Sequence, residues 1–201
     1  MARLYLAGMG KAYEFCLPTR GTVVPAGPDW LHEIKYDGYR MLVQRESDRV
    51  RLLTMNGNDW ADRYPWIVET ARKIRQTHFA IDGEAVVLGV DGVSDFDALQ
   101  SRNHDDEVQL YAFDLLAADG DDMRALPLSM RKTNLARLLR GRPEGIFVGP
   151  FEQGESLHSL GQGQEPRPPR NGARQRVVLP ARVNRPAELF VRMRDYINKG
   201  K

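Results

Sequence analysis

Short apolar runs separated by Asp-Gly and Asn-Gly pairs fill the first three quarters of this sequence. Such pairs favour tight turns between extended segments. The runs that we predict as strands are 31–35, 39–45, 50–54, 108–116 and 146–151, and 79–88 is predicted to form two short runs joined by a break at Asp82-Gly83-Glu84. We expect the runs at 39–45 and 50–54 to form a hairpin that places Lys35 and Arg40 on neighbouring pieces of one antiparallel sheet.

Three segments carry a helical pattern instead. Apolar residues recur at i, i+4 and i+7 within 65–74, which predicts an amphipathic helix. A short helix over 96–100 is expected to be capped by Ser94. A third helix opens at 127–128 and is predicted to cover the sheet with its leucines. The cations that we expect off its apolar stripe include Arg131 and Lys132.

Length and composition are those of an ordinary soluble protein. The 201 residues suit one domain with a possible appendage, and 42% of them are apolar. The single cysteine, Cys16, has no partner for an internal disulfide, which favours a reducing cytoplasm. No apolar run approaches the length of a membrane span, and the first residues are too broken to be a convincing signal peptide.

Charge and composition divide the chain into three parts. Residues 1–28 are rich in proline and glycine and are predicted to be an extended arm, and 29–155 hold the strand and helix patterns. Residues 156–201 carry a formal charge of +7, whereas 1–155 carry −5. This Pro- and Arg-rich tail has little periodicity, so we expect disorder there, with a short helix at 188–197.

Lys35 is the strongest candidate for covalent chemistry. It follows an apolar run and precedes the turn signal Asp37-Gly38, which predicts a position at the end of a strand facing a cleft. A lysine attacks only when neutral, so its ordinary pKa of about 10.4 has to fall by about 3, equivalent to roughly 4 kcal/mol. Arg40 and a divalent cation would supply the field that lowers the pKa.

Three motifs around this lysine occur in a familiar order. They are Lys35-x-Asp37-Gly38-x-Arg40, Asp82-Gly83-Glu84 and Tyr111-x-Phe113-Asp114. The set resembles the nucleotidyl-transfer motifs of ATP-dependent DNA ligases of the bacterial end-joining type and, more distantly, those of RNA ligases and capping enzymes. The resemblance implies an α+β nucleotidyltransferase fold, ATP-grasp-like, with antiparallel sheets flanked by helices.

The resemblance also implies a role for each motif residue. Lys35 would attack the α-phosphate of ATP with Mg²⁺ as the metal, and AMP would then pass to nicked or broken double-stranded DNA. End-joining repair proteins are the further partners that the resemblance implies. The implied nucleotide contacts are Glu33 to the adenine edge, Arg40 to phosphate or ribose, Glu84 to ribose or metal, and Phe113 as the stacking ring. The rival interpretations are a hairpin turn with solvated carboxylates at Glu84, and core packing of Tyr111 and Phe113.

The sequence departs from the ligase pattern in two places. Met55 stands where related ligases carry an arginine before Asn-Gly, so one phosphate-side contact is missing. After residue 155 we find neither Glu-Gly-x-Val-x-Lys nor Lys-x-Lys, and no oligonucleotide-binding barrel is expected. A truncated or frame-shifted ligase would give this change, and so would a genuine basic tail.

Three rival functions remain open beside the DNA ligase. An RNA-end or capping-type transferase would share the chemistry of Lys35. A catalytically inactive ligase remnant is favoured by Met55 and the missing lysines. A nucleic-acid-binding module without enzymatic activity would rest on the basic tail, with salt-sensitive DNA binding.

Overall fold

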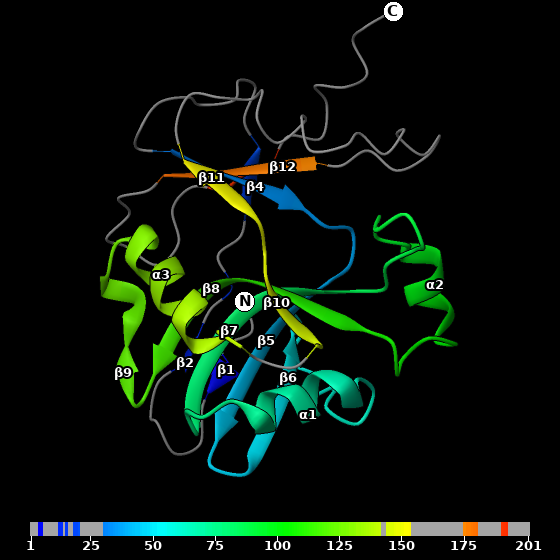
Figure 1. Cartoon of the computed structure of the whole chain (residues 1–201), viewed down its shortest axis with the longest axis horizontal. Coiled ribbons are helices and arrows are strands. Elements are labelled where there is room, and N and C mark those ends of the chain that lie inside the picture. The colour runs from blue at the N-terminus through cyan, green and yellow to red at the C-terminus, as the bar shows by residue number, and fades with distance from the viewer. Residues whose placement is uncertain are drawn as a thin grey trace, which may run out of the picture.

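The chain folds into two main sheets, one lying above the other, with helices around the larger sheet (Figure 1). The computed structural model describes residues 4–5, 12–13, 15, 18–20, 30–141, 144–153, 175–180 and 190–192. The predicted α+β class is confirmed by this arrangement.

The larger sheet holds six strands. In chain order they are β5 (Tyr39–Glu46), β6 (Arg49–Thr54), β7 (His78–Val86), β8 (Gln109–Ala118), β9 (Asp121–Asp122) and β10 (Ile146–Val148). Their order in space is β10-β8-β7-β5-β6, and β9 pairs with β8. All neighbours are antiparallel except β10 and β8, which run parallel. The predicted hairpin is confirmed, since β5 and β6 pair without interruption.

The smaller sheet holds β4, which ends at the candidate nucleophile. Its strands are β3 (Pro18–Arg20), β4 (Trp30–Lys35), β11 (Phe151–Gln153), β12 (Gln175–Pro180) and β13 (Phe190–Arg192). The order is β11-β4-β12-β13-β3, and only β13 and β3 are parallel among these pairs. A separate antiparallel pair joins β1 (Leu4–Tyr5) to β2 (Ala12–Tyr13).

Two stretches of the basic region 156–201 are therefore strands, although its composition predicts disorder. β12 pairs with all six residues of β4, and β13 extends the same sheet. The expected helix at 188–197 is wrong at 190–192, which form β13. Composition does not predict these strands, because β12 pairs with β4 and β13 pairs with β3, and both of these partners lie far away in the sequence. The remaining residues of this region lie outside the described part, and the division at 28 and 155 stays a prediction.

Three α-helices and one short 3₁₀ turn surround the larger sheet. They are α1 (Pro65–Lys73), α2 (Phe96–Ser101), the turn at Met123–Ala125, and α3 (Leu128–Leu138). Pro65 begins α1, where its missing N–H costs no helical hydrogen bond. Asp95, and not Ser94 as expected, caps α2, and its carboxylate accepts from Ala98 N at 2.9 Å. Ser94 Oγ instead accepts from Asp37 N at 3.0 Å.

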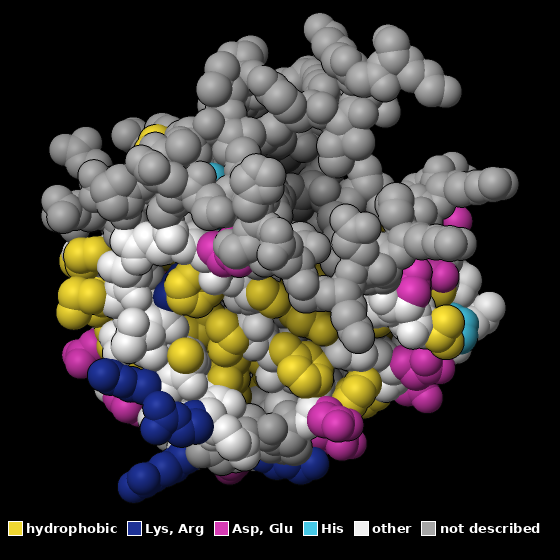
Figure 2. Space-filling view, turned by 45° about the horizontal axis from the view of Figure 1, so that its top comes forward, with side chains coloured by type: hydrophobic (Ala, Val, Ile, Leu, Met, Phe, Trp, Pro, Cys, Tyr) yellow, Lys and Arg dark blue, Asp and Glu magenta, His cyan; other side chains and the backbone are white. Residues whose placement is uncertain are grey.

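Both faces of the larger sheet are buried. One face packs against α1 and α3 in the main core, which includes Ile67 and Leu135. The opposite face carries a smaller cluster with Leu42 of β5 and Ala80 of β7. Because side chains alternate along a strand, Arg40 of β5 shares this second face with Leu42. Figure 2 shows hydrophobic side chains gathered in a hollow of one described surface, with basic and acidic side chains at its borders.

The predicted break at Asp82-Gly83-Glu84 is a continuous part of β7. The strand runs from His78 to Val86 and pairs on both sides, with β5 and with β8. A Cβ at Gly83 would lie 2.8 Å from the carbonyl oxygen of Tyr111, so glycine here permits close approach of two strands and makes no turn. Pairing partners on both edges override the local turn preference of Asp-Gly.

The expectation that Lys35 and Arg40 lie in one sheet is wrong. Lys35 ends β4 in the smaller sheet, and Arg40 lies on β5 in the larger sheet. The chain crosses between the sheets at Gly38, where a Cβ would lie 2.2 Å from the carbonyl oxygen of Ala85. The absence of a side chain at Gly38 therefore lets this crossing rest directly on the backbone of β7.

Substitution of Gly38 by alanine tests this contact. We expect Gly38→Ala to lower the free energy of unfolding by about 1–3 kcal/mol, because the added methyl forces the crossing away from β7. Urea denaturation followed by circular dichroism measures the loss. Gly89→Ala is the matched control, because its Cβ would meet the Asp91 side chain at 3.1 Å and would lie 3.7 Å from the carbonyl oxygen of Val93, which is an ordinary contact. Equal effects of the two substitutions would contradict a special role of Gly38.

Candidate active site

The loop after Lys35 is held by contacts to β7 of the larger sheet and to the segment just before α2. The Lys35 side chain is partly buried, and its Nζ donates to the carbonyl oxygen of Tyr36 at 3.3 Å. Asp37 N donates to Ser94 Oγ, and Gly38 lies against the backbone of Ala85. The loop is therefore fixed at two points directly after the candidate nucleophile.

Arg40 occupies the centre of the site. Its Nε and Nη2 each donate to a carboxylate oxygen of Asp82 at 2.8 Å, which is a bidentate pair. Its guanidinium carbon also lies 4.5 Å from the ring centroid of Phe113 and 5.7 Å from that of Phe15. Asp82 is 2% exposed, so Arg40 supplies the charge that a buried carboxylate requires. Sequence reasoning missed this role of Asp82.

Glu84 lies directly opposite Arg40 in the pairing of β5 and β7. Burial raises the pKa of Glu84 to about 7, and the positive charges of Arg40 and Lys35 act against this rise. The charge of Lys35 therefore acts on Glu84, although the two residues belong to different sheets. Glu84 is therefore not part of a solvated hairpin turn.

The aromatic residues of β8 divide into two different environments. Tyr111 stacks on Tyr36 with ring centroids 4.1 Å apart, and on Phe147 with centroids 5.6 Å apart. Phe113 contacts Arg40 instead. The register of β7 and β8 steps over Phe113, which is the extra residue of a β-bulge. A bulge turns a side chain out of the regular alternation, so Tyr111 and Phe113 are not equivalent as the two-residue period implied.

Glu33 is buried and bound by a residue that the sequence did not single out. It is 4% exposed, and its carboxylate accepts a hydrogen bond from Lys132 Nζ of α3. Lys132 is itself fully buried and also donates to the carbonyl oxygen of Phe113 at 2.7 Å. The expectation that the cations of this helix lie off its buried face is wrong for Lys132 and Arg131, whereas Arg137 and Arg140 are exposed as predicted.

The neighbouring cation of α3 is buried as well. Arg131 donates from Nε and Nη2 to the carboxylate of Asp114 on β8, at 2.8 Å and 3.0 Å. It also donates to the carbonyl oxygen of Leu126 at 2.7 Å. The helix is more than a cover for the sheet, because two consecutive side chains bind buried carboxylates. The sequence did contain a signal for the burial of Lys132. This residue follows Leu128 by four positions and precedes Leu135 by three, which places it on the apolar stripe of the helix.

Among the acids of the Asp82-Gly83-Glu84 motif, Glu84 is the candidate for contact with a magnesium ion. In the described ranges, no group of three or more His, Cys, Asp and Glu side chains is arranged to hold a metal ion. Asp82 is engaged by Arg40, so Glu84 is the remaining acid of its motif. Mg²⁺ in nucleotide sites is commonly held by one or two carboxylates together with substrate phosphates. Glu84 therefore fits an ion that arrives with a triphosphate.

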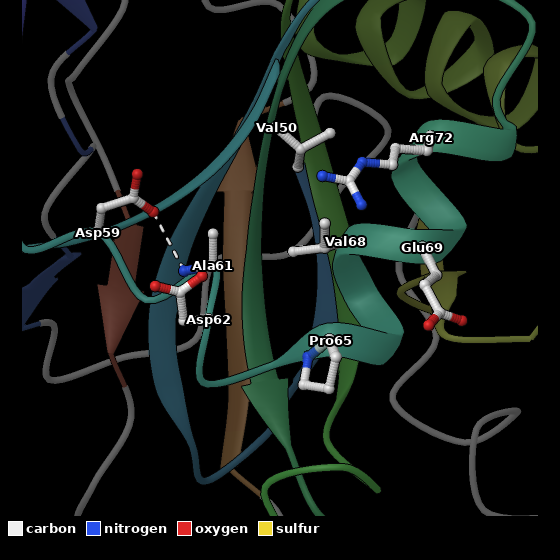
Figure 3. Close-up of a pocket in the computed structure, with 8 residues that line it drawn as sticks. All are labelled: Val50, Asp59, Ala61, Asp62, Pro65, Val68, Glu69 and Arg72. Carbon is white, nitrogen blue, oxygen red and sulfur yellow. Dashed lines mark hydrogen bonds between the residues drawn. The ribbon is translucent and has the colours of Figure 1, made fainter. Parts of the chain in front are cut away.

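A separate cavity of about 540 Å³ lies between β6 and α1 (Figure 3). Its lining includes Val50, Asp62, Val68 and Arg72, and none of the candidate site residues borders it. The Asp59 carboxylate at its rim is held by Ala61 N at 3.1 Å. This cavity is on the α1 face of the sheet, apart from the candidate site residues. None of the helices in the described part combines the length and the apolar character that crossing a bilayer requires.

The fold and the site define a nucleotidyltransferase-type domain, with a lysine at a strand end beside an acid, an arginine and aromatic rings. Residues 20–160 match the family described as ATP dependent DNA ligase domain. The multifunctional non-homologous end joining protein LigD of Pseudomonas aeruginosa is 36% identical over 136 residues, which cover 65% of this chain and 16% of that protein. LigD of Mycobacterium bovis is 40% identical over 116 residues, covering 55% of this chain and 15% of that protein.

A solved structure agrees with these sequence matches. The mycobacterial DNA ligase D complexed with ATP and MES superposes with a TM-score of 0.68 and 29% identity, covering 88% of this chain and 58% of the other. This chain belongs to the ATP-dependent DNA ligase family, which confirms the family and the nucleotidyltransferase fold predicted from the three motifs. The matched part spans about a sixth of the length of the curated LigD relatives.

The raised pKa of Glu84 predicts a pH-dependent stability. The folded state holds the proton up to about pH 7, whereas an unfolded glutamate releases it near its ordinary value of 4.5. Stability should therefore fall as the pH rises between these values, by on the order of 2 kcal/mol. Glu84→Gln removes the titration, so it should be the more stable protein at pH 8 and close to wild type at pH 4.5.

Urea denaturation between pH 4.5 and pH 8 measures this difference. Glu69→Gln, at an exposed position of α1, is the control and should follow the wild-type curve. Parallel curves for wild type and Glu84→Gln over the whole range would show that burial does not raise the pKa of Glu84.

Proposed function

We propose that this chain is the adenylation domain of an ATP-dependent DNA ligase of the bacterial end-joining type. It would form a lysyl-AMP intermediate for sealing nicks during DNA repair and recombination. The observation that carries the proposal is the position of Lys35 at the end of β4, in electrostatic contact with Glu84 and one loop away from Arg40. The LigD relatives, named for non-homologous end joining, and the mycobacterial ligase solved with ATP support it.

The proposed reaction begins at the amine of Lys35. The neutral Nζ forms a bond to the α-phosphorus of ATP, the bond from that phosphorus to the bridging oxygen breaks, and pyrophosphate leaves while the amine proton passes to solvent. AMP is then transferred to a 5′-phosphate of nicked DNA, and the adjacent 3′-hydroxyl displaces it. Mg²⁺, when bound, neutralises the triphosphate charge and assists the departure of pyrophosphate.

The other site residues would hold the nucleotide. In this proposal Glu33 contacts the adenine edge and Phe113 stacks on the base, an interaction worth about 1–3 kcal/mol. Arg40 contacts phosphate or ribose from the position that Asp82 fixes, and Glu84 contacts ribose or metal. The proposed partners are nicked or broken double-stranded DNA and end-joining repair proteins, and the proposed location is the cytoplasm.

Covalent capture of AMP tests the proposal. After incubation with ATP and Mg²⁺, intact-mass measurement should show the protein with one added AMP, and peptide mapping should place it on Lys35. Lys35→Ala should form no adduct, because alanine has no nucleophile. Lys73→Ala, on the exposed side of α1, is the control and should be labelled like wild type.

Other outcomes of this experiment would support the rival functions. An adduct with GTP but not with ATP would indicate a capping-type transferase. If wild type forms no adduct with either nucleotide, the proposal fails. Salt-sensitive DNA binding that is unchanged in Lys35→Ala would then favour a nucleic-acid-binding module.

Met55 allows a gain-of-function test. Its side chain is 47% exposed in the turn after β6, and Thr54 before it lies opposite Met41. Met55 therefore lies at the same end of the sheet as Arg40. We expect Met55→Arg to lower the ATP concentration for half-maximal adduct formation about tenfold, because an arginine adds a charge-assisted hydrogen bond to phosphate.

Kinetics of adduct formation at a series of ATP concentrations measure this change. Met130→Arg is the matched control, since Met130 is similarly exposed, at 51%, but lies on α3. The same improvement in both variants would show that added positive charge acts from a distance, and that position 55 does not contact the nucleotide.

A further inference from the structure

Lys132 joins three elements at one buried point. Its side chain is fully buried on α3, and Nζ donates to the Glu33 carboxylate of β4 and to the Phe113 carbonyl oxygen of β8. Nζ also lies 4.8 Å from the ring centroid of Phe151 on β11. One ammonium group therefore connects the smaller sheet with the larger one.

The two partners of Lys132 lie where a nucleotide base would be recognised. Glu33 and Lys35 are two positions apart on β4, so their side chains leave the same face of the strand, roughly 7 Å apart. Phe113 offers an aromatic ring, whose face can stack on any base. A carboxylate beside such a ring adds an acceptor for the edge of the base. The two groups together suit a base that stacks and also presents an N–H donor.

We propose that Lys132 is a positioning residue that holds Glu33 as a hydrogen-bond acceptor for the 6-amino group of the nucleotide base, and thereby selects adenine over 6-oxo purines. This inference rests on the proposed function, because it assigns base selectivity to the same nucleotide site. It adds a residue from α3 that does not touch the base and acts through Glu33.

The hydrogen bond from Lys132 to the Glu33 carboxylate explains the selectivity. Burial raises the pKa of Glu33, and the charge and hydrogen bond of Lys132 act against this rise. An ionised carboxylate only accepts hydrogen bonds, whereas a protonated one also donates. With Lys132 in place, Glu33 accepts from a 6-amino group and repels a 6-oxo group. Without Lys132, Glu33 loses the cation and the hydrogen bond that favour its ionised form, and a protonated carboxyl group can donate to a 6-oxo group.

The test compares adduct formation with ATP and with ITP, which carries a 6-oxo group. For each variant, kcat and KM for adduct formation are measured with both nucleotides. We expect the preference of kcat/KM for ATP over ITP to fall about tenfold or more in Lys132→Met and in Glu33→Gln. Lys132→Arg keeps the positive charge and should retain most of the wild-type preference. The double variant Glu33→Gln/Lys132→Met should have the preference of Glu33→Gln alone, because Lys132 acts through Glu33.

Arg131→Met provides the matched control. Arg131 is the adjacent residue of α3, is also buried, and also binds a carboxylate, that of Asp114. This variant should lose stability and keep the wild-type preference for ATP over ITP. A merely structural role of Lys132 would give the same result for Lys132→Met.

The possible results separate this inference from the proposed function. An unchanged preference for ATP in either Glu33→Gln or Lys132→Met overturns the inference, while an adduct on wild type upholds the proposed function. If Lys132→Met does not fold, an unchanged preference in Glu33→Gln is sufficient to overturn the inference. No adduct on wild type with either nucleotide overturns the proposed function and the inference with it.

Discussion

The positive charge of Lys132 is buried without contact with solvent, and the spacing of the two sheets depends on how that charge is compensated. Removing an ammonium ion from water costs several kcal/mol even after relaxation, so a buried lysine is stable only with well-placed acceptors. Glu33 and the Phe113 carbonyl oxygen are such acceptors, one on each sheet. A shift of β4 relative to β8 would leave the ammonium and the carboxylate uncompensated. Electrostatics therefore fixes the relative position of the nucleophile strand and the aromatic strand.

The same principle recurs across the site. Asp82 is bound by Arg40 and Asp114 by Arg131, so three buried carboxylates in this region each have a cation from another element. Each pair is weak as a source of stability, because desolvation offsets much of the attraction. Each pair nevertheless constrains the positions of its two elements, because separating the partners would leave an unpaired charge in an apolar environment. A site that has to hold a triphosphate in one orientation benefits from such constraints.

Local patterns predicted the parts of the fold that depend on local sequence. The hairpin of β5 and β6 and the helix that begins at Pro65 follow from residue period and turn chemistry. The pair Asp-Gly shows where this reasoning stops, because it forms a crossing between sheets at Gly38 but lies inside a strand at Gly83. The difference is set by which strands lie alongside, and a short window of sequence does not contain that information.

The sequence predicted some residues of the candidate site and missed others. The motif spacing identified Lys35, Arg40 and Glu84, which the structure brings together from two sheets. Asp82 and Lys132 were missed, because only Glu84 of the motif was given a role and a cation on a helix was assigned to the surface. The position of Lys132 on the apolar stripe between Leu128 and Leu135 was the available signal. Periodicity should therefore be applied to charged residues as well as to apolar ones.

The pairing of β4 has a consequence for synthesis of the chain on the ribosome. β4 is complete at residue 35, but its partners in the described structure are β11 at 151–153 and β12 at 175–180. Until those segments emerge from the exit tunnel, both edges of β4 expose backbone hydrogen-bonding groups to other nascent chains. The strand that carries the nucleophile is thus translated early and enclosed late, so its exposed edges are a place where chaperone protection would matter.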